Sequence, residues 1–192
     1  MAYLVLGLVL FIGVHSVRIV AEDWRTRTIT RIGAQPWKGA YSVLSLAGFL
    51  LIVWGFSQAR MAPIQLWIPP LALRHLAAPL TLIAFVLLAA AYVPANGIKA
   101  RLHHPMVLAI KVWALAHLLA NGNLAHVLLF GSFLVWAVLS FSAARRRDRV
   151  AATVYAPGQT ARTLITLVVG TVAWATFAMW LHGWWIGIRV FG

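Results

Sequence analysis

The sequence predicts an all-α protein, a polytopic bundle of about six transmembrane helices. Of its 192 residues, 62% are hydrophobic and only 10% are charged, and so few charges cannot build a water-facing surface for a chain of this length. The apolar residues gather in six runs, each approaching the roughly 20 residues that cross the hydrocarbon core of a bilayer. The period-two alternation of a transmembrane barrel does not occur, so helices are the structure that pairs every backbone group in lipid.

The six runs set the expected spans. They are approximately Ala2–Val20, Gly39–Ser57, Ala77–Ala95, Met106–Ala120, Leu124–Ala143 and Thr163–Ile188. We expect the first to be a retained helix, because no basic segment precedes it and no small-residue cleavage site follows. The stretch Ile64–Leu73 is too short to span, and we expect it to lie along the membrane surface with Trp67 as an anchor. A single domain over residues 1–192 is predicted.

The charge of the chain follows the same pattern. Sixteen Lys and Arg against three acidic residues give a formal charge of +13, which in a soluble protein would suggest nucleic acid. Here the basic residues lie between apolar runs, where they orient helices and meet anionic head groups. We therefore expect membrane lipids, and no nucleic acid, as partners. Only Arg60, Arg74 and Arg189 lie on the less basic side, so the positive-inside rule predicts that both termini are outside the cytoplasm of a bacterial inner (plasma) membrane.

Ionisable and polar groups inside the spans are the candidate functional residues, because such groups are costly in lipid. The first run holds His15 and Arg18, and the fourth holds Lys111 and His117, with Asn121 on the same helical face as His117. For Arg18, an interfacial ion pair with Glu22 one turn later is the favoured explanation.

The chain contains no cysteine, which excludes thiolate ligands and covalently attached haem, so any metal chemistry must rest on the seven histidines. A single membrane histidine is usually explained by an interhelical hydrogen bond, worth about 0.6 kcal/mol. Two midmembrane histidines on different helices, His15 and His117, could instead be axial ligands of a non-covalently bound haem. The residues alone leave both explanations open.

A basic patch precedes the fourth run. His103 and His104 follow Lys99 and Arg101 there, and the patch is either an ordinary positive-inside anchor, which we favour, or a site for an anionic head group. The run Arg145–Arg149 is most simply a stop-transfer signal.

Several motifs resemble one known family. Ile98–Met106, continuing through Lys111–Gly122, resembles the signature of the NnrU family of bacterial membrane proteins, and the same pattern includes Gly13–Ser16, Phe130–Phe133 and Ala144–Arg149. The resemblance covers nearly the whole chain. It implies a link to nitrite and nitric oxide metabolism in denitrifying bacteria and a similarity to 15-cis-zeta-carotene isomerase, a membrane protein that uses haem b to isomerise a carotenoid double bond.

That similarity implies roles for three histidines. His15 and His117 would be the axial ligands of haem b, and His104 would be a neighbouring polar residue of undefined role. The protein would then be a haem-dependent cis-trans isomerase with a carotenoid or another apolar ligand. The alternative is a non-enzymatic accessory protein for denitrification that helps the assembly or transport of a partner.

The helix directions bear on this pairing. The first and fourth runs are antiparallel, and His15 lies past the middle of its run toward the cytoplasm while His117 lies past the middle of its own run toward the outside. The two residues therefore differ by roughly 11 Å in depth. Helix boundaries that are predicted from a sequence are in error by about 3–6 Å on each helix. If the two rings do not converge, we expect His117 to pair with His126, His182 or His75, or no haem to bind.

Overall fold

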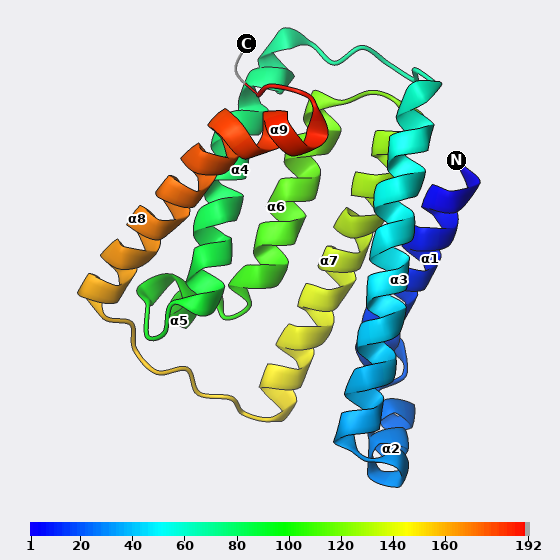
Figure 1. Cartoon of the computed structure of the whole chain (residues 1–192). Helices are drawn as coiled ribbons and strands as arrows, with labels where there is room; N and C mark the ends of the chain where they lie inside the picture. Colours follow the sequence, from blue (N-terminus) through cyan, green and yellow to red (C-terminus); the bar gives the residue numbers. More distant parts are fainter. Residues whose placement is uncertain (191–192) are drawn as a thin grey trace. The chain divides into compact units, whose positions relative to one another are not determined.

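The computed structural model of the chain describes residues 1–190 (Figure 1). It divides into two compact units, residues 1–68 with 121–143 and residues 69–120 with the chain from 144 onward. The first unit contains α1 (Ala2–Val20), α2 (Glu22–Ile32), α3 (Ala34–Met61) and most of α7 (Leu124–Val150). The second contains the end of α7 together with α4 (Leu71–Tyr92), α5 (Gly97–Leu102), α6 (Pro105–Ala120), α8 (Thr160–Thr176), the π-helical turn η1 (Phe177–Leu181) and α9 (His182–Ile186).

The predicted helical membrane architecture is confirmed. Among the described residues, five helical segments are long and apolar enough to cross a membrane: α1, α3, α4, α7 and the continuous stretch Thr160–Ile186. Helix α6 corresponds to the fourth predicted run but has only 16 residues, about 24 Å of helix against a hydrocarbon core of roughly 30 Å. Apart from Met106 and Leu115, its side chains are buried or half-buried. The orientation of the termini and the single-domain organisation stay predictions.

In the first unit, α1 packs along α3 through glycines. A Cβ atom added to Gly7 would lie 2.6 Å from the backbone nitrogen of Ile52, and one added to Gly48 would lie 2.8 Å from that of Phe11. Small residues let transmembrane helices approach closely, and the association is then driven by van der Waals packing. Leu4, which is fully buried, completes this core.

In the second unit, α4 lies between α6 and α8 (Figure 1). Gly170 of α8 approaches the backbone of Val86, where an added Cβ would lie 2.6 Å from the Cα atom. A polar contact joins the same two helices, because Nε1 of Trp174 donates to Oγ1 of Thr81 over 3.1 Å. Packing and one side-chain hydrogen bond therefore hold α8 on α4.

Helix α2 was not expected, since its residues lie between the first two predicted spans, Ala2–Val20 and Gly39–Ser57. Its first turn carries Glu22 and Asp23, its last turn carries Arg31, and none of its residues is buried. Acidic residues at the N-terminus and a basic residue at the C-terminus interact favourably with the helix dipole. A search for apolar runs cannot find a helix that is stabilised in this way.

The stretch that follows α3 pairs with a turn in the first unit. The backbone nitrogens of Leu66 and Trp67 donate to the carbonyl of Gly122 over 2.8 and 3.0 Å, and the nitrogen of Leu124 donates to the carbonyl of Ile64 over 2.9 Å. Gly122 lies directly against the Trp67 carbonyl, so a side chain at position 122 would collide with it. The stretch Ile64–Leu73, which was predicted to lie along the membrane surface, is therefore extended as far as Pro70. Its last residues, from Leu71 onward, belong to α4.

Candidate functional site

His15 lies in the first unit among aromatic rings. Its ring stacks on that of Phe11, with centroids 4.2 Å apart, and the rings of Tyr41 and Trp136 lie at 5.2 and 6.1 Å. Nδ1 of His15 is 2.7 Å from the backbone carbonyl of Phe11, four residues earlier on α1. Three helices, α1, α3 and α7, thus supply the surroundings of this ring.

His117 of the second unit is held by the same local hydrogen bond. Its Nδ1 atom is 2.8 Å from the backbone carbonyl of Trp113, again four residues earlier, and the two rings lie 5.2 Å apart. His117, which was predicted to be a haem ligand, therefore makes the same hydrogen bond within α6 as His15 makes within α1.

The shared hydrogen bond determines the tautomer of both rings. A carbonyl oxygen can only accept, so Nδ1 carries the proton, and in the neutral imidazole the lone pair is on Nε2. Metal-ligating histidines are usually fixed in this way, by donation of the other ring N–H to a backbone carbonyl or a carboxylate. The donor chemistry of His15 and of His117 therefore fits ligation of a haem iron. Because the two residues belong to different units, their pairing on one iron stays a prediction.

A second set of polar side chains, which we call the His104 cluster, lies in the second unit. It consists of His103, His104, Arg145, Asp148 and Tyr155. Nε2 of His104 donates to Oδ2 of Asp148 over 2.8 Å, and the hydroxyl of Tyr155 donates to the same oxygen over 3.0 Å. Arg145 donates to Nδ1 of His103, whose ring stacks on Tyr155 with centroids 3.9 Å apart and planes 8° apart. The end of α7 is thus tied to the start of α6.

The backbone at His103 is strained. Its φ and ψ angles are +69° and −55°, and the nitrogen of His104 donates to the carbonyl of Leu102 over 2.9 Å. These are the features of a γ-turn of the rare, strained kind. Strain of this type persists where the surrounding contacts hold it, and in this turn the contacts are those of the cluster.

Tyr155, in the loop after α7, is affected electrostatically. Burial raises the pKa of its phenol above the ordinary value of 10.0, and the hydrogen bond to Asp148 and the negative charge of that carboxylate raise it further. Asp148 is the only acidic side chain in the sequence after Asp23, so this single carboxylate accepts two hydrogen bonds beside four arginines of the 145–149 run.

Comparison with protein-family models decides the family. The model described as NnrU protein matches residues 3–190. The chain belongs to the NnrU family. The match includes His15, His117 and the whole His104 cluster. Comparisons with curated proteins and with solved structures find no match.

Three further candidates of this NnrU chain have partners within the protein. Nε of Arg18 lies 3.7 Å from Oε2 of Glu22, so the predicted ion pair is confirmed. Lys111 and Asn121 are half-buried, and each interacts with other groups of the chain. Whether either acts on a ligand stays a prediction.

The alternative histidines differ in their surroundings. His126 is only 9% exposed, its Nδ1 is 2.5 Å from Oδ1 of Asn123, and its ring lies edge-on to Phe56. Nδ1 of His182 contacts the carbonyl of Ile188 over 2.7 Å, and His75 is exposed. Within residues 1–190, no three His, Cys, Asp or Glu side chains converge as a metal site.

Sequence reasoning missed the partners of the candidate histidines. Asp148 and Tyr155 were not singled out, although a lone acid inside an arginine run was a visible signal. The aromatic neighbours Tyr41 and Trp136 were also missed, because nothing in their spacing relates them to His15.

Proposed function

We propose that this NnrU protein is a haem b protein of the membrane and that His15 and His117 are the residues that would hold the haem iron. The observation that carries the proposal is the shared hydrogen bond: each Nδ1 donates to the carbonyl four residues earlier, over 2.7 and 2.8 Å. A histidine so bonded presents Nε2 as its basic nitrogen and cannot rotate freely. The resemblance of the motifs to those of a haem-dependent isomerase, which stays a prediction, favours the same two residues.

The side chains around His15 would orient this ligand and exclude water from it. Phe11, Tyr41 and Trp136 surround the ring on three helices, and the low polarity of such surroundings strengthens the Nδ1 hydrogen bond to the Phe11 carbonyl. When bound, haem would supply a redox-active iron that can also act as a Lewis acid toward a polyene. On this proposal the reaction is cis-trans isomerisation of a carotenoid.

The absorption spectrum of the purified protein tests haem binding. Expressed with ample haem, the wild type should show a Soret band, and His15→Ala and His117→Ala should each lose or shift it. His75→Ala is the matched control, because His75 is exposed, and its spectrum should equal that of the wild type. A colourless, folded wild-type protein would refute the proposal.

The isomerase activity needs its own experiment. The haem-loaded protein is incubated with a 15-cis carotene under reducing conditions, and the isomers are separated chromatographically. We expect the wild type to convert the 15-cis carotene and His117→Ala not to convert it. No conversion by a protein with an intact Soret band would remove the enzyme activity and leave haem binding. The link to nitrite and nitric oxide metabolism, with or without an accessory role, rests on the resemblance and stays a prediction.

A further inference from the structure

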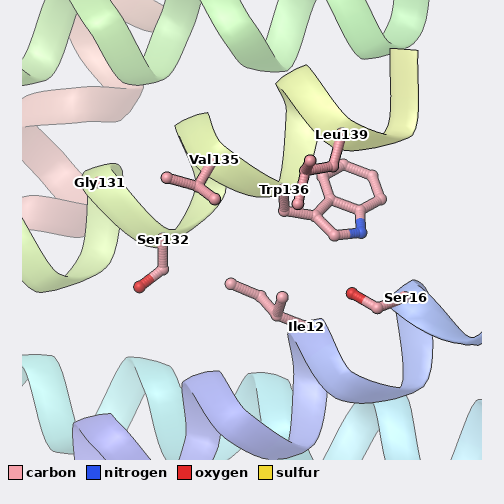
Figure 2. Close-up of a pocket in the computed structure, with 7 residues that line it drawn as sticks. All are labelled: Ile12, Ser16, Gly131, Ser132, Val135, Trp136 and Leu139. Carbon is pink, nitrogen blue, oxygen red and sulfur yellow. The ribbon is translucent and has the colours of Figure 1, made fainter. Parts of the chain in front are cut away.

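A groove of about 390 Å³ lies between α1 and α7 in the first unit. Figure 2 shows its lining residues, Ile12 and Ser16 of α1 facing five residues of α7. Those five are Gly131, Ser132, Val135, Trp136 and Leu139. The volume falls within the range of small-molecule sites, roughly 300–1,000 Å³. Val135 and Leu139 are 60% and 52% exposed, so the outer wall of the groove is apolar and lies on the surface of α7, a helix long and apolar enough to cross a membrane.

One end of the groove carries unused hydrogen-bonding groups. Nε1 of Trp136 is buried and has no acceptor among the described residues, which is unfavourable for a donor that has lost its water. The hydroxyl of Ser16 makes no hydrogen bond to the described part of the chain either. Figure 2 shows the indole nitrogen and this hydroxyl at the same end of the groove. Ser132, at the other end, already donates to the carbonyl of Leu128 over 2.6 Å.

The chemistry of the lining selects a class of ligand. None of the seven residues is charged, so an anionic group would be desolvated without compensation. Two donors without acceptors favour a ligand that accepts, and a pure hydrocarbon offers no acceptor. We propose that the groove binds a lipid-soluble quinone, with one carbonyl oxygen accepting from Nε1 of Trp136 and the hydroxyl of Ser16 and with the apolar tail lying along Val135 and Leu139.

The site is separate from the ligand pair of the proposed function. His15 does not line the groove, although its ring lies edge-on to that of Trp136. Binding of the quinone needs no haem, so it is measured on protein prepared without haem. A negative result for haem therefore does not decide this inference, and a negative result for the quinone does not decide haem binding.

The test uses the full chain in nanodiscs of diether lipids, which contain no ester carbonyl that could compete. A photoreactive decyl-benzoquinone is titrated, and its attachment site is mapped by mass spectrometry. We expect saturable labelling of residues 12–16 and 131–139, competed by unlabelled decyl-benzoquinone. Decylbenzene, which has the same tail and no carbonyl, should not compete. This comparison changes only the probe and does not depend on any variant folding.

Two variants examine the proposed donors. Trp136→Phe keeps an aromatic ring and removes the N–H, and Ser16→Ala removes the hydroxyl. Each should weaken binding roughly 3–10-fold, the effect of losing one hydrogen bond. Trp54→Phe is the matched control, because Trp54 lies on α3 of the same unit and does not line the groove, and its affinity should equal that of the wild type.

Three outcomes would overturn the inference. If decylbenzene competes as well as unlabelled decyl-benzoquinone, the groove is a hydrophobic surface that does not recognise the carbonyl group. Labelling outside the two segments would place the quinone elsewhere. Loss of labelling in ester-lipid nanodiscs at the same quinone concentration would identify a bilayer lipid as the preferred occupant.

Discussion

Nε2 of His104 lies 2.8 Å from Oδ2 of Asp148, forty-four residues later in the chain. Their side chains are 23% and 17% exposed. The pair fastens the residue that precedes α6 to the last turns of α7. Because Tyr155 donates to the same carboxylate oxygen, a single atom joins three parts of the second unit.

Asp148→Asn should destabilise the protein. The amide keeps the size of the side chain but loses the charge that strengthens both hydrogen bonds. We expect the midpoint of thermal unfolding in detergent to fall by about 2–4 °C, the size expected for one lost hydrogen bond in a chain of this length. Equal midpoints for Asp148→Asn and the wild type would contradict this role.

The phenol of Tyr155 should ionise at a higher pH than an ordinary tyrosine does. Its pKa is raised by burial first and by Asp148 second, so the folded state holds this proton longer than the unfolded state does. The resulting stability is present below the ordinary pKa of about 10 and is lost as pH rises through the folded pKa. The difference in ultraviolet titration between the wild type and Tyr155→Phe isolates this phenol. In Asp148→Asn, the pKa of Tyr155 should fall part of the way toward its ordinary value, because the effect of burial remains.

The contact between α1 and α3 should depend on Gly7. A Cβ at this position would lie 2.6 Å from the nitrogen of Ile52, whereas one at Gly13 of the same helix meets nothing within 4 Å. Gly7→Ala should therefore cost about 1–3 kcal/mol of unfolding free energy, as overpacked sites do. Gly13→Ala, the matched control, should be neutral or stabilising by up to about 1 kcal/mol through helix propensity. Unfolding in mixed micelles measures both, and similar values would show that the helices can separate at no cost.

The hydrogen bond from Trp174 to Thr81 should couple α8 to α4. A double-mutant cycle with Trp174→Phe and Thr81→Val isolates the interaction. Side-chain hydrogen bonds between transmembrane helices average about 0.6 kcal/mol with a maximum near 1.7 kcal/mol, so we expect a coupling energy in that range. Pairing Trp174→Phe with Thr160→Val, at an exposed position at the other end of α8, should give no coupling. Equal coupling energies in the two cycles would contradict this prediction.

The spans were predictable because apolar length is a property of consecutive residues. The bounds of α1 coincide with the predicted run Ala2–Val20, and α6 begins one residue before the predicted start at Met106. Helix α2 was not found because its stability comes from terminal charges and not from burial. The extended pairing of Leu66 with Gly122 was not found because the partners are distant in sequence.

The candidate site was predictable only as a set of residue types. The sequence placed His15 and His117 inside membrane helices, but the Nδ1 hydrogen bonds depend on side-chain rotamers, which residue spacing does not determine. His104 was predicted to belong to a basic anchor, and the structure supplies Asp148 as its partner from another helix. Contacts between residues far apart in the chain follow from tertiary packing.

The turn at His103 gives the two neighbouring imidazoles different partners. Arg145 is always a donor, so Nδ1 of His103 accepts in this contact. His104 faces the carboxylate of Asp148 instead. The strained backbone thus directs adjacent, chemically identical side chains to partners of opposite charge. The two histidines are therefore not interchangeable, because one accepts from a cation and the other donates to an anion.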